Sequence, residues 1–225
     1  MSHHRFSPTR LLPLLALALL TACGSTTTID EIRSSNEPLQ YNEGDRMVVL
    51  GRHEAGHYET DLEFVRCVGN QVKAIEEMEV IPEVQFLDAL FPWFEPRTAP
   101  KSLKRLQVLL ERPALRAKLK ELNLRYMIWL DGHTDTSNHS GSMSCTIGPG
   151  GGGCFGLTSW DKTSFYEALV WDVTQMREMG RVRVDSEGSN YMIGLGAPIP
   201  LLAQVKTEAC SGMGKQLKTF FEANR

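Results

Sequence analysis

The chain has 225 residues, with 24 lysines and arginines against 27 aspartates and glutamates, so its formal net charge is −3. This mildly acidic balance argues against a nucleic-acid-binding protein, which typically carries a strongly basic face. The length suffices for one sizeable domain or two small ones.

The first 22 residues have the pattern of a secretory signal. Arg5 and Arg10 lie in a basic leader, an apolar run covers residues 11–20, and small residues follow it. The apolar run is too short for a membrane-spanning helix, which needs roughly 20 apolar residues. Residues 1–22 are therefore predicted to be a signal peptide.

The end of this segment, Leu20-Thr21-Ala22-Cys23, resembles the lipobox of bacterial lipoproteins, in which a small residue and Ala or Gly separate Leu from Cys. The resemblance implies cleavage after Ala22, a diacylglycerol on the Cys23 sulfur and an acylated new N-terminus. Cys23 would then hold the protein in a lipid bilayer without a basic membrane-binding face. The alternative is an ordinary signal peptide with an incidental cysteine.

A periplasm-facing location in the bacterial envelope follows from the lipobox resemblance. Gly24 rather than Asp follows the cysteine, which in enteric lipoproteins favours the outer membrane over the inner one. Cleavage would remove two arginines and no acid, so the mature chain would carry a net charge of −5. Residues 23–45 are rich in Ser, Thr, Asn and Glu, and are predicted to form a flexible tether.

Four further cysteines suggest two disulfides in an oxidising compartment. Cys145 and Cys154 flank a glycine-rich loop, and a bridge across its base would limit the conformational entropy of that loop. Cys67 and Cys210 then pair by elimination. Free buried thiols or a metal site are the alternative, although none of these cysteines has the spacing of a structural zinc site.

The folded domain is predicted to cover residues 46–225 and to begin with alternating strands and helices. A buried strand is expected at Met47–Leu50, and Thr60-Asp61-Leu62-Glu63 fits a capping box that opens a helix. A short strand at Val80-Ile81 follows. Three helices come next, after Pro82, after Ser102 and after Pro113.

The second half changes to strands. Tyr126–Leu130 is predicted as the central strand, and residues 142–147 and 154–160 as two strands joined by the glycine loop. Further alternating strands around residues 165–173 and 182–184 form a hairpin, and a final helix includes Val205 to Phe220.

This order predicts an α/β fold with one mixed sheet, parallel in its N-terminal part and antiparallel in its C-terminal hairpins, flanked by helices. In its element order the domain is similar to the periplasmic α/β domains of the curli-secretion lipoprotein, the TolB N-terminal domain and the lipoprotein activators of penicillin-binding proteins. That similarity bears on the fold and not on function.

Two groups of residues are candidates for metal chemistry. His53, Glu54 and His57 match H-E-x-x-H, in which two histidines one helical turn apart bind zinc. However, Gly56 lies inside the motif, which follows a strand directly, so a solvated loop is favoured. Asp131, with His133, Asp135 and His139, follows the central strand and is interpreted as a polar turn.

Aromatic residues form the candidate partner-binding segment. Phe91, Trp93 and Phe94 lie between Pro92 and Pro96, and could anchor a partner protein, rest on a lipid interface or close the core.

The sequence thus predicts a non-enzymatic, membrane-anchored binding or assembly module, without a cofactor and with an unidentified envelope protein as partner. A periplasmic zinc hydrolase and a structural lipoprotein without a defined ligand are the alternatives.

Overall fold

The computed structural model describes residues 25–34, 39–40, 42–54, 57–58, 60–73, 75, 78–94, 98, 100 and 102–222, with backbone alone at 53, 54, 57, 58 and 103. The predicted signal peptide and Cys23 lie outside the described residues. The described chain divides into two compact units. Unit 1 comprises residues 136–162 and 187–204 with the first two residues of the first strand, and unit 2 comprises the remainder.

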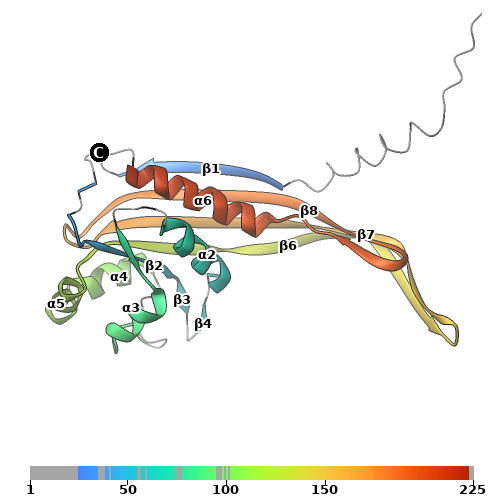
Figure 1. Cartoon of the computed structure of the whole chain (residues 1–225), viewed down its shortest axis with the longest axis horizontal. Helices are drawn as coiled ribbons and strands as arrows, with labels where there is room; N and C mark the ends of the chain where they lie inside the picture. Colours follow the sequence, from blue (N-terminus) through green and yellow to red (C-terminus); the bar gives the residue numbers. More distant parts are fainter. Residues whose placement is uncertain are drawn as a thin grey trace, which may run out of the picture. The chain divides into compact units, whose positions relative to one another are not determined.

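A six-stranded mixed sheet organises the described chain (Figure 1). Its strands, in hydrogen-bonded order, are β1 (Ser25–Arg33), β8 (Arg177–Leu201), β7 (Gly151–Asp172), β6 (Leu124–Gly148), β2 (Arg46–Gly51) and β5 (Glu79–Ile81). β2 runs parallel to both β5 and β6, whereas two-residue and four-residue turns join β6 to β7 and β7 to β8 as hairpins. The predicted mixed α/β fold is confirmed.

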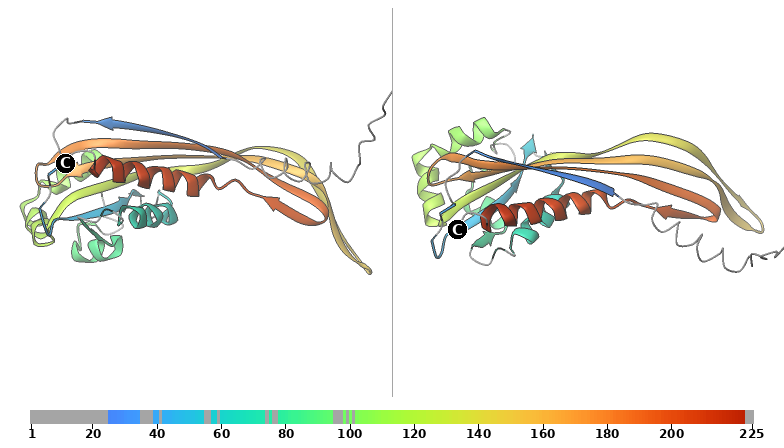
Figure 2. Two further views of the ribbon diagram at one scale, coloured as in Figure 1. Left: turned by 45° about the horizontal axis from the view of Figure 1, so that its top comes forward. Right: turned by 90° about the horizontal axis from the view of Figure 1, so that it is seen from above.

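Five helices are present among the described residues: α2 (Leu62–Val72), α3 (Glu83–Ala89), α4 (Leu103–Leu110), α5 (Pro113–Glu121) and α6 (Val205–Glu222). All five belong to unit 2. α2 and α6 pack together on one face of its sheet, and α4 and α5 lie on the other side of the strands from α6 (Figure 2, right). No described helix is long and apolar enough to cross a membrane.

Alternation along the strands of unit 2 divides its core into two layers. Met47 and Val49 of β2 belong to the cluster under α2 and α6, while Val48 and Leu50 belong to the cluster under α3, α4 and α5. The same division separates Tyr166, Ala168 and Val170 of β7 from Leu169 and Trp171. Since both faces are covered, these strands are almost continuously apolar in sequence, as predicted for buried strands.

The start of α2 differs from the expected capping box. Asp61 is the N-cap, and its Oδ1 accepts hydrogen bonds from the backbone N–H groups of Glu63 and Phe64 at 2.9 and 3.4 Å. Thr60 is fully buried, and its hydroxyl donates instead to the carbonyl of Leu130 at 2.9 Å. A tertiary contact with β6 therefore takes the hydroxyl that the local pattern assigns to the helix.

The packing of α2 against α6 is close and covalently secured. Cys67 and Cys210 form a disulfide with their Cα atoms 6.2 Å apart. Gly214 lets the helices approach, because a Cβ there would lie 2.4 Å from the Cβ of Gln71. At the other end, Lys206 Nζ contacts carboxylate oxygens of Asp61 and Glu63 at 3.0 and 2.6 Å.

Two expectations about the strands are corrected. Residues 25–33, predicted to belong to the tether, form β1 at the edge of the sheet. The short strands expected after Leu130 are parts of long ones, so that Asp131, His133, Asp135 and His139 lie on β6 and not in a turn. Short-range patterning misplaced these breaks because polar residues continue a strand wherever a neighbouring strand supplies backbone hydrogen bonds.

Candidate functional site

Unit 1 is a sheet region built from the adjoining parts of β6, β7 and β8. Its two long segments, residues 136–162 and 187–204, contain only three charged side chains: Asp161, Lys162 and Glu187. No helix occurs among its described residues. Among the residues that the structure describes, no helical layer of this unit covers its strands.

Large apolar side chains are exposed on all three strands of unit 1. With Leu202, which directly follows β8, their exposed fractions run from 48 % to 95 %, and the residues are Ile147, Phe155, Leu157, Leu195, Ile199 and Leu202. Only Asn190, Gly194 and Ala203 are buried among the described residues of this unit. Exposed aliphatic residues are ordinary when scattered singly, but a grouped set marks an interaction surface.

Covalent and polar contacts order unit 1 in place of a hydrophobic core. The disulfide between Cys145 and Cys154 joins β6 to β7 with a Cα–Cα distance of 4.0 Å, next to the two-residue turn at 149–150. Both predicted disulfides are therefore present. Such a bridge fixes the register of the hairpin, because it holds two directly opposite residues together.

Side-chain hydrogen bonds continue this ordering away from the turn. Asp161 accepts from Ser189 at 2.6 Å and from Asn138 at 3.1 Å. These bonds, that from Ser189 first, lower the pKa of Asp161. Asn190 accepts from the backbone N–H of Ala203 at 2.9 Å and donates to the carbonyl of Trp160 at 3.5 Å.

The edge formed by β6 in unit 1 is irregular. β2 pairs with β6 only as far as Leu130, so β7 is the one described strand beside residues 136–148. Asn138 and Gly141 of this edge have positive φ angles of 53° and 83°. Such backbone breaks restrict pairing with foreign strands along this edge.

The predicted aromatic segment is divided by the structure. Phe94 is buried and packs edge-on against Phe86 with ring centroids 5.4 Å apart, and Trp93 packs against the same core layer. Phe91 alone is exposed, at 65 %. The three side chains therefore do not form one surface, because two of them close the core beneath α3.

Metal coordination finds little support among the described residues. His53–Glu54 and His57–Tyr58 form β3 and β4, an antiparallel pair, whereas H-E-x-x-H zinc sites require a helix; the side chains of His53, Glu54 and His57 lie outside the described atoms. On β6, Asp131 pairs with Arg52 at 3.1 Å, and His133 contacts Asp135 at 2.9 Å. No described group of three or more potential ligands is close enough to share an ion.

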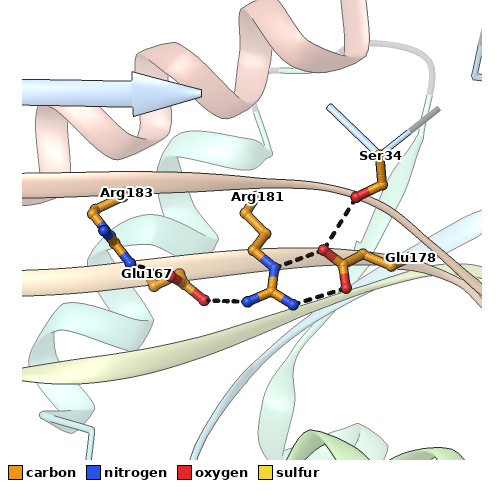
Figure 3. Close-up of polar contacts among 5 residues, drawn as sticks. All are labelled: Ser34, Glu167, Glu178, Arg181 and Arg183. Atoms are coloured by element: carbon orange, nitrogen blue, oxygen red, sulfur yellow. Dashed lines mark hydrogen bonds and ion pairs between the residues drawn. The ribbon is translucent and has the colours of Figure 1, made fainter. Parts of the chain in front are cut away.

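A charged strip on β7 and β8 of unit 2 is the other conspicuous polar feature (Figure 3). Arg181 binds Glu178 through two nitrogens at 2.6 and 3.0 Å and Glu167 at 3.2 Å. Glu167 also accepts from Arg183 at 3.1 Å, and Glu178 accepts from Ser34 at 3.2 Å. The hydrogen bond that Arg181 donates to Glu178 lowers the pKa of the Glu178 carboxyl. Because the two arginines and the two glutamates compensate one another, the strip ties β7 to β8.

Comparisons with known proteins identify no family. No family model and no characterised relative matches the sequence. Among solved structures, PelC dodecamers from Paraburkholderia phytofirmans are similar at 12 % and 13 % identity, covering 86 % of this chain and 96 % of theirs. Both have a TM-score of 0.38, at which the similarity carries no argument about this chain.

The exposed apolar surface of unit 1 was missed at the level of sequence. The sequence places Ile147, Phe155 and Leu157 in two strands joined by the glycine loop, without an expectation about their exposure. The signal that could have found them is the scarcity of charge from residue 136 to 160, where no Asp, Glu, Lys or Arg occurs. A solvated strand face normally carries such residues.

Proposed function

We propose that this protein is a membrane-anchored envelope lipoprotein that acts as a non-enzymatic binding or assembly module, with unit 1 as its binding surface. One observation carries the proposal: unit 1 exposes five large apolar side chains on three strands and a sixth directly after β8, and no described helix of the unit covers them. Binding a partner would remove this apolar area from water, at roughly 25 cal/mol per Å².

The chemistry of unit 1 favours a protein surface over lipid as its occupant. Serine, threonine and asparagine side chains of β6, such as Thr136, Ser137 and Ser144, are exposed on the same unit as the apolar residues. Hydrocarbon offers these hydroxyl and amide groups no hydrogen-bond partners. A protein interface accommodates both kinds of group, with an apolar centre and a polar rim. The expected partner surface is therefore apolar and nearly uncharged.

Lipid attachment at Cys23 supplies the location of the module in this proposal. If the lipid on Cys23 is the anchor, Cys23→Ala moves the full chain from the membrane fraction to the soluble fraction of a Gram-negative host, as measured by sedimentation. A variant that still sediments with membranes would contradict the anchor.

The binding surface is tested by comparing two matched substitutions in the full, lipidated chain. Leu157→Asp places a charge on unit 1, and Val108→Asp places one on α4 of unit 2, at positions exposed by 52 % and 58 %. Chemical crosslinking in the envelope, followed by quantitative mass spectrometry, measures which proteins each variant retains.

We expect Leu157→Asp to lose a partner that both the wild type and Val108→Asp retain, because a buried charge without a counterpart weakens an apolar interface. The partner, once purified, must bind the isolated wild-type chain and Val108→Asp, and must bind Leu157→Asp more weakly. Equal retention by both variants would sink the proposal. Binding of protein-free vesicles that depends on Leu157 would assign the surface to lipid instead.

A further inference from the structure

We infer that the groove between α2 and the edge strand β5 binds an extended acidic peptide, which adds to β5 as a further strand. This site lies wholly in unit 2 and is separate from the binding surface proposed for unit 1. The occupant is a partner segment in which apolar and acidic residues alternate.

The groove has the shape and the floor that an extended segment needs. It encloses about 300 Å³ between α2, β5 and the start of α3. Val49, Val65 and Val80 line it from β2, α2 and β5, and Val84 of α3 stands 62 % exposed beside it. One or two aliphatic side chains would fill this volume and cover these residues.

β5 supplies the backbone pairing. It is the last strand in the order of the sheet and pairs with β2 alone among the described strands. No described strand pairs with its other edge, and strand addition at such an edge is a common mode of peptide recognition. The three residues of β5 set a short pairing length.

Gly69 is the feature that internal packing does not explain. It lies inside α2, where glycine weakens a helix, yet a Cβ at this position would meet nothing within 4 Å. Gly214 of α6 offers the contrast, since a Cβ there would collide with Gln71. Gly69 instead leaves open space on the wall of the groove, and an occupant would use that space.

Charge identifies the kind of peptide. Arg66 and Lys73 lie two turns apart on the side of α2 that lines the groove, and neither has an ion pair with a described residue. Among the described residues, Lys73 contacts the neutral Asn70, at 3.3 Å. Two described carboxylates nearby are engaged: Glu79 binds Arg46 at 2.7 Å, and Glu83, which lines the groove, accepts from the backbone N–H of Gly51 at 3.1 Å. A peptide with carboxylates flanking its apolar anchor would complement both cations.

The test uses the full chain in detergent and a fluorescent ten-residue peptide of alternating Glu and Val, followed by fluorescence anisotropy. Two peptide controls accompany it, one with Lys in place of Glu and one with proline at two central positions. The chain is net negative, so general electrostatics would favour the Lys peptide, whereas the groove favours the Glu peptide. Proline removes the N–H groups needed for strand addition.

Substitutions then locate the binding. Gly69→Trp should weaken binding of the Glu peptide at least tenfold by filling the groove, while Gly69→Ala should leave it within twofold. The double variant Arg66→Glu, Lys73→Glu changes two exposed side chains, so it should abolish binding of the Glu peptide without altering the thermal unfolding transition. It keeps the inference testable if Gly69→Trp does not fold.

Three results would overturn the inference. The first is no binding of the Glu peptide at millimolar concentration. The second is equal binding of the Lys peptide or the proline peptide. The third is binding that the Arg66→Glu and Lys73→Glu changes leave intact, or binding of anionic vesicles in place of the peptide.

Discussion

β7 passes through both units, and its apolar side chains meet different surroundings in them. In unit 2, Leu169 and Trp171 lie almost completely buried under α3, α4 and α5. In unit 1, Phe155 and Leu157 on the same strand are more than half exposed. The residues are of similar type, so what differs is the presence of a helical layer.

The two units differ in what orders their strands, because neither hydrophobic core cluster of the described residues extends into unit 1. Unit 2 gains its order from burial on both faces, the usual basis of a folded domain. Unit 1 relies on the Cys145–Cys154 bridge and on hydrogen bonds to Asp161 and Asn190. Such contacts fix geometry but leave apolar area in water, and that area is available to a partner.

Removing the two disulfides separately should give the largest contrast. The double variant Cys67→Ala, Cys210→Ala removes a disulfide whose cysteines are 143 residues apart in sequence. Chain entropy alone then predicts that the free energy of unfolding falls by about 5 kcal/mol. Cys145→Ala with Cys154→Ala opens a separation of 9 residues, for which the same relation gives about 2.5 kcal/mol as an upper bound.

Denaturant unfolding measures the first loss. For the second pair we expect local opening, seen as faster amide exchange at residues 140–158, with little change in the main transition. Equal shifts of the main transition in both double variants would contradict the separation of the units.

Truncation of one phenylalanine in each unit should give the next largest difference. Phe64 is fully buried and stacks on Tyr166, with ring centroids 3.5 Å apart, so Phe64→Ala should cost about 3–5 kcal/mol. Phe155 is 64 % exposed, and Phe155→Ala should change stability by less than about 0.5 kcal/mol. Urea titrations of both variants check this, and a cost above about 2 kcal/mol for Phe155→Ala would show that unit 1 has a core.

Acid sensitivity should arise in part from the charged strip of unit 2. The hydrogen bond from Arg181 lowers the pKa of Glu178 from its ordinary 4.5. As the pH falls, Glu178 is therefore protonated in the unfolded chain before it is protonated in the folded one. The stabilisation that the ion pair gives is complete above the ordinary pKa and is lost as the pH falls through the lowered pKa of the folded state.

Glu178→Gln should thus lose a contribution below about 1 kcal/mol near neutral pH, since the pair is partly exposed, and its stability should fall less steeply as the pH drops below the ordinary pKa of 4.5. Arg181→Met provides the control, because it should flatten the same part of the profile. An unchanged slope in both variants would contradict the assigned cause.

The sequence predicts unit 2 better than unit 1, for physical reasons. Strands such as Met47–Leu50 and Tyr126–Leu130 are buried on both faces, so their apolar runs identify them directly. The pairing of Cys67 with Cys210 followed from elimination once the glycine loop had assigned Cys145 to Cys154. Local patterns of this kind require no knowledge of distant contacts.

The remainder depends on contacts between residues far apart in the chain. Thr60 was assigned to the helix cap, but its hydroxyl bonds to Leu130, which is 70 residues away. β6 was broken after Leu130, because nothing local shows that β7 continues beside it. The exposure of Phe155 likewise depends on whether distant parts of the chain cover it, which its neighbours in sequence do not reveal.

Site-specific photocrosslinking from two matched positions tests the role of unit 1 most directly. A benzophenone side chain replaces Phe155 of unit 1 or Phe91 of unit 2, two phenylalanines exposed by 64 % and 65 %, in the full lipidated chain within the envelope. The account predicts one defined protein adduct from position 155 that Leu157→Asp removes, and none of that mass from position 91. An adduct from position 91 alone, or no protein adduct from position 155, would contradict unit 1 as the binding surface.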